Sequence, residues 1–131
     1  MKIKQVSVFA ENQPGRFLAV LQALKAANIN LHAASISENA EFGIVRMIMD
    51  DPEKGAAALK KAGFTGRTDM LISAEIPDVP SGLLKNVIEP LAAAGVNIDY
   101  FYAFIEQKPG TARIVLKTSD DDKAEKALKG K

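Results

Sequence analysis

The sequence of this chain matches itself when it is shifted by 67 positions. "AANINL" then coincides with "AAGVNI", and "VRMIM" coincides with "ARIVL". Single matches keep the same order along the chain: Gly15 with Gly82, Ala27 with Ala94, Asn30 with Asn97, Arg46 with Arg113, and Gly63 with Gly130. The 131 residues are therefore expected to form two copies of one short unit, residues 1–67 and 68–131, so the fold must be one that such a unit can adopt twice.

The first copy reads as βαββα followed by a further strand. Residues 6–9 predict a strand, and Pro14 and Gly15 begin a helix, for which Asn28 is a suitable left-handed C-terminal residue. Two strands follow, the second at 42–49. Asp51 then caps a helix that has Pro52 at its first position. The apolar face of the first helix is expected to consist of Phe17, Leu18, Leu21 and Leu24.

The second copy repeats this order with two differences. Pro90 lies inside the helix that carries Leu84, Val87, Ile88 and Leu91, and it should bend that helix or open its hydrogen bonding. Residues 96–104 alternate over a long strand, and "SDDD" predicts a helix capped by Ser119. Only Lys131 follows Gly130, so the second copy lacks its last strand. Either the strand at 70–76 serves both copies or the sequence stops short of its natural end; we expect the latter.

Composition excludes several classes of function. The net charge of +1 lacks the basic excess of a nucleic-acid-binding protein, and the absence of Cys rules out disulfides and thiolate sites. No apolar run reaches the length of a membrane span, so we expect a soluble cytoplasmic protein that contacts neither nucleic acid nor membrane. No nucleophile and base, no paired carboxylates, no phosphate loop and no metal cluster stand out. We therefore expect no enzyme activity, no catalytic residues, no cofactor and no metal.

The string "VSVFAENQPGRFLAVLQALKAANINL" resembles the ACT domain, a small ferredoxin-like βαββαβ module that binds amino acids. The similarity lies in the strand, the "ENxPG" turn, the helix and "NINL", and it extends over nearly the whole chain as two tandem modules. It implies an α+β fold with antiparallel sheets, a homodimer, and a regulatory protein that senses a free amino acid and modulates a partner enzyme.

The resemblance also implies where the amino acid binds, between modules, against the first turn and the start of the second strand. An Asn side chain offers a donor and an acceptor, and helix-terminal N–H groups favour a carboxylate. Gly15 lets the ligand approach the backbone without a Cβ in the way. The implied ligand-binding residues are Asn12, Gln13, Pro14, Gly15, Arg16, Asn30 and Leu31, with weaker second-module equivalents at Asp78, Val79, Gly82 and Asn97.

Two departures from the family pattern bear on the ligand. Ala10 stands where the phosphoglycerate dehydrogenase type carries a ligand histidine, which argues against a serine site of that design. In the second copy "PDVPSG" places Val79 opposite Asn12 and adds a residue between Pro80 and Gly82. We therefore expect unequal sites, the first being the better one, with Asp78 as the remaining polar group of the second.

Other interpretations of these residues remain open. Asn12 is compatible with an ordinary turn residue, and His32, the only histidine, lacks partners for a metal or catalytic role. Asp50 and Asp51 are better explained by helix capping than by a cation, and the aromatic strand Tyr100 to Phe104 by packing than by base stacking. Two other functions compete with the sensor: an assembly module with a degenerate pocket, and an acylphosphatase-like enzyme suggested by "PGR".

Overall fold

The computed structural model spans the chain and describes residues 1–11, 13–39, 42–105 and 108–129. It divides into an N-terminal unit, Lys4–Met70, and a C-terminal unit, Leu71–Lys131 together with Met1–Ile3. The strands have the hydrogen-bonded order β2-β3-β1-β4-β6-β5, and their pairings are antiparallel where the register is defined. Tandem ferredoxin-like modules are thus confirmed. None of the described helices is long and apolar enough to cross a membrane.

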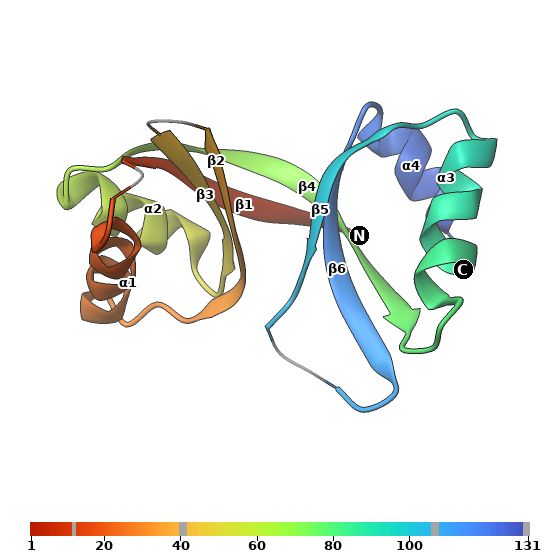
Figure 1. The fold of residues 1–131 in the computed structure, drawn as a ribbon, viewed down its shortest axis with the longest axis horizontal. Helices are drawn as coiled ribbons and strands as arrows, with labels where there is room; N and C mark the ends of the chain where they lie inside the picture. The colour runs from red at the N-terminus through yellow and green to blue at the C-terminus, as the bar shows by residue number, and fades with distance from the viewer. Residues whose placement is uncertain (12, 40–41, 106–107, 130–131) are drawn as a thin grey trace. The chain divides into compact units, whose positions relative to one another are not determined.

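The N-terminal unit contains β1 (Lys2–Glu11), α1 (Arg16–Ala26), β2 (Leu31–Asn39), β3 (Phe42–Met49), α2 (Pro52–Lys61) and the first part of β4 (Thr65–Pro77). Both helices cover the same face of the sheet (Figure 1). Alternation along the strands turns one set of side chains toward the helices, where they form a core of Val6, Val8, Ala10, Val20, Leu24, Val45, Met47, Met49, Leu59 and Phe64. Because this face of the sheet is apolar, the helices that cover it need an apolar side, and the same holds in the C-terminal unit.

The buried face of α1 differs from the expected one. Val20 and Leu24 are buried and Phe17 packs against the core, whereas the side chain of Leu18 is 58% exposed. The prediction that Leu18 belongs to the core face was therefore wrong. The apolar periodicity of "RFLAVLQAL" is compatible with two neighbouring faces, and only packing against the sheet decides between them.

The C-terminal unit is built from the second part of β4, η1 (Leu84–Ile88), α3 (Glu89–Ala93), β5 (Ile98–Ala103), β6 (Thr111–Thr118) and α4 (Asp121–Leu128). Its core includes Ile72, Val87, Leu91, Ile114 and Leu116. The first helix of the unit contains a π-helical stretch, η1, which ends two residues before Pro90. Because proline lacks an N–H, the opened hydrogen bonding predicted for this helix is confirmed.

Strand β4 serves both units, since residues 65–70 belong to the N-terminal unit and residues 71–77 to the C-terminal one. The sharing of this strand, the first of the two alternatives, is thus confirmed, whereas the expectation that the sequence stops short of its natural end stays a prediction. In the C-terminal unit, Met1, the residue before β1, lies beside β4. The Ser73 N–H donates to the Met1 carbonyl at 2.7 Å, and the Met1 amino group donates to the Ser73 carbonyl at 3.2 Å.

The first strands of the two units, β1 and β4, align with a shift of 66 residues, one fewer than the helices and the remaining strands. Ile72, Ala74 and Ile76 contribute to the C-terminal core as Val6, Val8 and Ala10 contribute to the N-terminal one. The same shift brings Pro80 onto Pro14, and Ser81 is then the inserted residue. Continued one residue past the ends of these strands, the same shift pairs Asp78, and not Val79, with Asn12 in the sequence, although Asn12 itself lies outside the described residues.

Helix ends follow local chemistry in both units. Asn28 and Gly95 have φ of 59° and 71° and occupy equivalent left-handed positions after the first helix of each unit. The Asp51 carboxylate accepts from the Lys54 N–H, as predicted for a cap. The cap of α4 is Asp120, which accepts from the Lys123 N–H, so the prediction of Ser119 was wrong by one residue. Ser119 instead accepts from the Asn97 N–H through its hydroxyl.

The ion pair between Lys2 and Asp122 makes the stability of the C-terminal unit depend on pH. Lys2 Nζ donates to Asp122 Oδ1 at 2.6 Å, and this hydrogen bond, with the lysine charge, lowers the pKa of Asp122. A lowered folded-state pKa contributes stability above the unfolded pKa, near pH 4, and this contribution is lost as pH falls through the folded value. We expect Asp122→Asn to flatten the acid limb of the curve of unfolding free energy against pH.

Urea titrations at several pH values between 2 and 6 measure how the free energy of unfolding decreases toward acid pH. Lys2→Gln removes the same pair from the other side and should flatten it in the same way. A limb that is equally steep in wild type and in Asp122→Asn would show that this pair does not contribute.

Candidate functional site

The turn before α1 brings four of the predicted ligand residues together. The Gln13 N–H donates to the Glu11 carbonyl at 2.8 Å, and the Gln13 carbonyl accepts from the Arg16 N–H at 3.3 Å. Gly15 has φ of 89°, a left-handed conformation that is strained for any residue with a side chain, and among the described residues no atom beyond its chain neighbours lies within 4 Å of the place where a Cβ would stand. Asn12 lies outside the described residues. The turn is therefore open on the side where glycine exposes the backbone.

Arg16 supplies positive charge at this turn. Its guanidinium carbon lies 5.0 Å from the centre of the Phe64 ring, and its Nε is buried without a hydrogen-bond partner in the described part of the chain. The first turn of α1 has no acidic residue, and Gly15 offers no side-chain cap. The positive end of the helix dipole and the arginine thus act together, and the site suits an anionic group such as a carboxylate.

Asn30 and Leu31 lie at the other end of the N-terminal unit. In the sheet, Glu11 pairs with Phe42, and Phe42 pairs with Asn39, so the turn after Glu11 lies beside the end of β2. Leu31, at the start of β2, pairs instead with Met49. The intervening helix has 11 residues and is about 16 Å long. The Asn30 N–H donates to the Asp50 carboxylate at 3.2 Å, and the Asn30 carbonyl accepts from the Asp50 N–H at 3.1 Å. These bonds fix the backbone of Asn30, while its side chain is exposed. One unit alone does not bring Asn30 to the turn.

The corresponding turn of the C-terminal unit is built differently. The Asp78 N–H donates to the Gly110 carbonyl at 3.0 Å, and the Val79 carbonyl accepts from the Gly82 N–H at 2.9 Å. Gly82 is buried, and a Cβ there would stand 2.1 Å from the Pro77 carbonyl oxygen. Glycine is thus required at Gly15 by its positive φ angle, and at Gly82 because there is no space for a Cβ. The two turns do not offer the same surface to a ligand.

Asn97 shares the backbone role of Asn30, and its side chain also makes a hydrogen bond within its own unit. The Asn97 N–H donates to the Ser119 hydroxyl at 2.9 Å, and the carbonyl of Asn97 accepts from the Ser119 N–H. The Asn97 amide also donates to Asp99 at 3.2 Å. Part of its hydrogen-bonding capacity is therefore already used within its own unit.

The residues with catalytic or metal-binding potential remain dispersed. His32 is half-buried next to a bulge in β2, and no group of three or more acidic or histidine side chains that could hold a metal occurs among the described residues. Met47 is fully buried and Met49 is 4% exposed, so both belong to the core. Tyr102 and Phe104 are also buried, whereas Phe101 is 46% exposed.

Two hollows lie near residues that sequence reasoning did not single out. One, of about 440 Å³, runs between α2 and the start of β4 and includes Val8, Phe64 and Thr65. The other, of about 130 Å³, lies in the C-terminal unit beside Arg113, whose guanidinium carbon is 4.5 Å from the centre of the Phe104 ring. Each unit thus contains a contact of an arginine with an aromatic ring, between distant residues in the first unit and across a hairpin in the second.

Comparison with known proteins decides the family. A model of the ACT domain pair matches residues 1–130. The chain belongs to the ACT domain pair family. Its fold is similar to that of protein BT0572 of Bacteroides thetaiotaomicron, at 40% identity and a TM-score of 0.90, over 98% of this chain and 88% of that one.

More distant structures share the fold. The ACT domain pair superposes on the regulatory subunit of aspartate kinase from Thermus thermophilus with a TM-score of 0.67 at 16% identity, over 95% of this chain and 89% of that one. The corresponding subunit from Thermus flavus gives 0.60 at 16% identity, with the same shares covered. A search of curated protein sequences found no match.

Proposed function

We propose that this ACT domain pair is a non-catalytic regulatory protein that binds a free amino acid and modulates a partner enzyme or regulator. The observation that carries the proposal is the open turn at Gln13–Arg16, where a left-handed glycine, a helix N-terminus without acids and an arginine come together. Such a turn suits the carboxylate of an amino acid. Membership in the ACT domain pair family supports this class of ligand.

The ligand site that we propose combines the turn of one copy with Asn30 and Leu31 of another. Support comes from the distance within one unit, because an 11-residue helix separates the two ends. A homodimer would bring the second set of donors to the first, and a ligand held between copies would favour the associated state. A ligand shifts the equilibrium between monomer and dimer only if its affinity differs between these two states.

The second turn is proposed as a weaker site or none. Asp78 would place a carboxylate where an amino acid presents its own, and Val79 is 54% exposed without a polar group to offer. Gly82, being buried, does not open the backbone to a ligand as Gly15 does. Occupancy of one ligand site per chain follows from this proposal.

A panel of the twenty amino acids in a thermal-shift assay tests the proposal. A ligand that binds only the folded state must raise Tm, by an amount that grows with its concentration over Kd. We expect one chemical class to raise Tm at millimolar concentration and the effect to be lost in Asn12→Ala and in Asn30→Ala. Asn30→Ala should itself change stability by no more than about 0.5 kcal/mol, because its backbone carries the bonds to Asp50.

Asp78→Ala in the second turn is the matched control and should keep the ligand response. Equal loss in Asp78→Ala would contradict the assignment to the first turn. No response to any amino acid by a well-folded sample would favour the assembly module. Hydrolysis of an acyl phosphate would favour an acylphosphatase-like enzyme, and its absence would remove that alternative.

A further inference from the structure

Leu18 is an exposed leucine in the first turn of α1, next to the proposed amino-acid site. Its side chain is 58% exposed, so the core of the N-terminal unit does not account for it. Leu18 is the third residue after Gly15, and helical side chains lean toward the N-terminus, over the turn that precedes them. The surface beside Gly15 is therefore the surface that a leucine at this position covers.

The type of residue at this position also decides how the start of the helix is satisfied. A Glu or Gln three residues after the N-cap can reach back to the N-cap N–H, whereas leucine cannot. Gly15 provides no side-chain cap, and none of the described hydrogen bonds uses the N–H groups of Phe17 and Leu18. A carboxylate bound at this turn would thus meet open N–H groups with an apolar side chain beside them.

Arg16 and Leu18 lie on different sides of α1. Two residues along an α-helix correspond to about 200° around its axis. The Arg16 guanidinium packs against the Phe64 ring, and its Nε is buried, so this side of the helix start faces the core. Leu18 faces solvent. A ligand whose carboxylate lies at the end of the helix has room for its own side chain on the side of Leu18.

The second unit shows that the repeat does not require leucine here. The first helices of the two units align with a shift of 67, in which buried Leu24 corresponds to buried Leu91. Leu18 then corresponds to Lys85, which is exposed. The fold therefore accepts a charged side chain at this position, and the exposed leucine of the first unit needs another reason.

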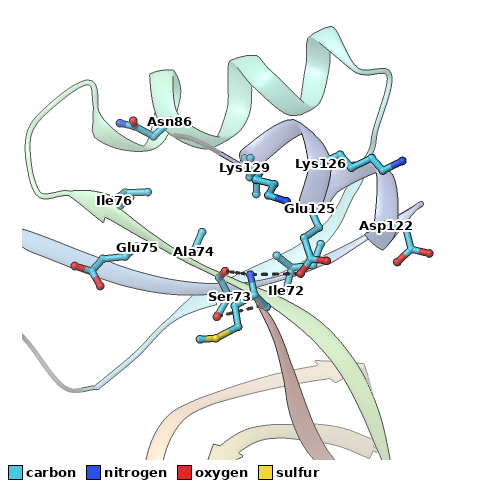
Figure 2. A pocket seen from close by; sticks show the side chains of 12 residues that line it. Ile72, Ser73, Ala74, Glu75, Ile76, Asn86, Asp122, Glu125, Lys126 and Lys129 are labelled. Carbon is cyan, nitrogen blue, oxygen red and sulfur yellow. Dashed lines mark hydrogen bonds and ion pairs between the residues drawn. The ribbon is translucent and has the colours of Figure 1, made fainter.

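The helix start of the C-terminal unit is polar beyond Lys85. The side-chain amide of Asn86 donates to the Gly82 carbonyl at 2.9 Å. Figure 2 shows Asn86 of η1 at the rim of a hollow of about 780 Å³ beside β4. In α1 the residue equivalent to Asn86 is Ala19, which cannot make such a bond. The two helix starts thus differ in polarity as well as in the shape of the turn before them.

We propose that Leu18 makes the amino-acid site selective for ligands with an apolar side chain over ligands with a polar or acidic one. This inference rests on the proposed function and specifies the class of its ligand. The carboxylate of the ligand lies at the N–H groups of α1, and its side chain packs on Leu18. That contact removes apolar surface from water, whereas a polar side chain loses hydration there without gaining a partner.

Three amino acids of nearly the same shape test the proposal. L-leucine, L-asparagine and L-aspartate share their branching and differ in polarity and charge, and isothermal titration calorimetry on the full chain compares their affinities. We expect leucine to bind at least about fivefold more tightly than the other two. Leu18→Ala should weaken leucine binding about fivefold and leave asparagine binding within about twofold of wild type.

Two further variants define the effect. Leu18→Lys introduces the residue that the second unit has at this position, and it should weaken leucine binding and strengthen aspartate binding. Leu84→Ala is the matched control, because Leu84 is a 50% exposed leucine at the helix start of the C-terminal unit. It should leave all three affinities unchanged. Because Leu18 and Leu84 are exposed, the Tm without ligand should change little in these variants.

Several results would overturn the proposal. Leucine that binds no more tightly than asparagine, or equally well to Leu18→Ala, would leave the amino-acid site in place and remove its selectivity. Preference of the wild type for aspartate would assign the ligand side chain to Arg16 instead. Equal weakening of all three ligands by Leu18→Ala, with a change of oligomeric state, would make Leu18 a contact between copies. No response to any of the twenty amino acids would overturn the proposed function itself.

Discussion

Alanine in place of Leu91 is expected to lower the free energy of unfolding by about 2–5 kcal/mol. Leu91 is 1% exposed and belongs to the core that α3 forms against the sheet of the C-terminal unit. Removal of its side chain loses apolar burial and leaves a cavity, and the cost depends on how far the neighbours can close it. Urea unfolding followed by circular dichroism measures the change through the midpoint at constant slope.

Leu24 provides a matched variant in the other unit. It is the residue equivalent to Leu91 in the 67-residue repeat and is 2% exposed. Leu24→Ala is expected to cost a similar amount. Strands β1 and β4 each supply residues to both units, so we expect one transition in each variant and not two. A loss below about 1 kcal/mol in both variants would contradict the packing of the two cores.

Gly66→Ala is the second substitution for which we expect a large effect. Its Cβ would stand 2.2 Å from the Ser7 carbonyl oxygen and 2.8 Å from a methyl group of Val8. The nearest of these atoms belongs to the backbone, so it cannot turn away, and β1 and β4 must separate locally. The expected destabilisation is about 1–3 kcal/mol, the range for overpacked sites, and differential scanning calorimetry would measure it as a lower Tm.

Gly43→Ala is the control for this prediction. Gly43 also lies in a strand, but its nearest neighbours would be 3.5 Å from the new Cβ, an ordinary contact distance. Alanine there should be close to neutral. If both variants were equally stable, the close approach of β4 to β1 at Gly66 would be wrong.

The order of elements could be predicted from the sequence because it depends on local chemistry. Left-handed Asn28, the Asp51 cap with Pro52, and the disturbed helix before Pro90 are each governed by a few neighbouring residues. The repeat also provided a second occurrence of the same order of helices and strands in the sequence. The choice between Leu18 and Val20 for the core depends instead on contact with the sheet, and helical spacing leaves it undecided.

The candidate site was predictable in part. The residues Gln13 to Arg16 are adjacent in the chain, so a motif can bring them together. The separation of Asn30 from the turn, the Arg16 contact with Phe64, and the role of Asp78 in the second turn depend on strand direction and register. The extra residue, Ser81, is visible in the sequence, but which residues of β1 and β4 are equivalent becomes clear only from the side chains that enter the two cores.

The thirteen residues of β4 form one continuous strand across the midpoint of the repeat. A gene cut between codons 67 and 68 would therefore split a strand that each half needs, and neither product would carry all the strand residues of its unit. The two halves of this chain, divided at residue 67, are therefore not expected to fold as separate fragments.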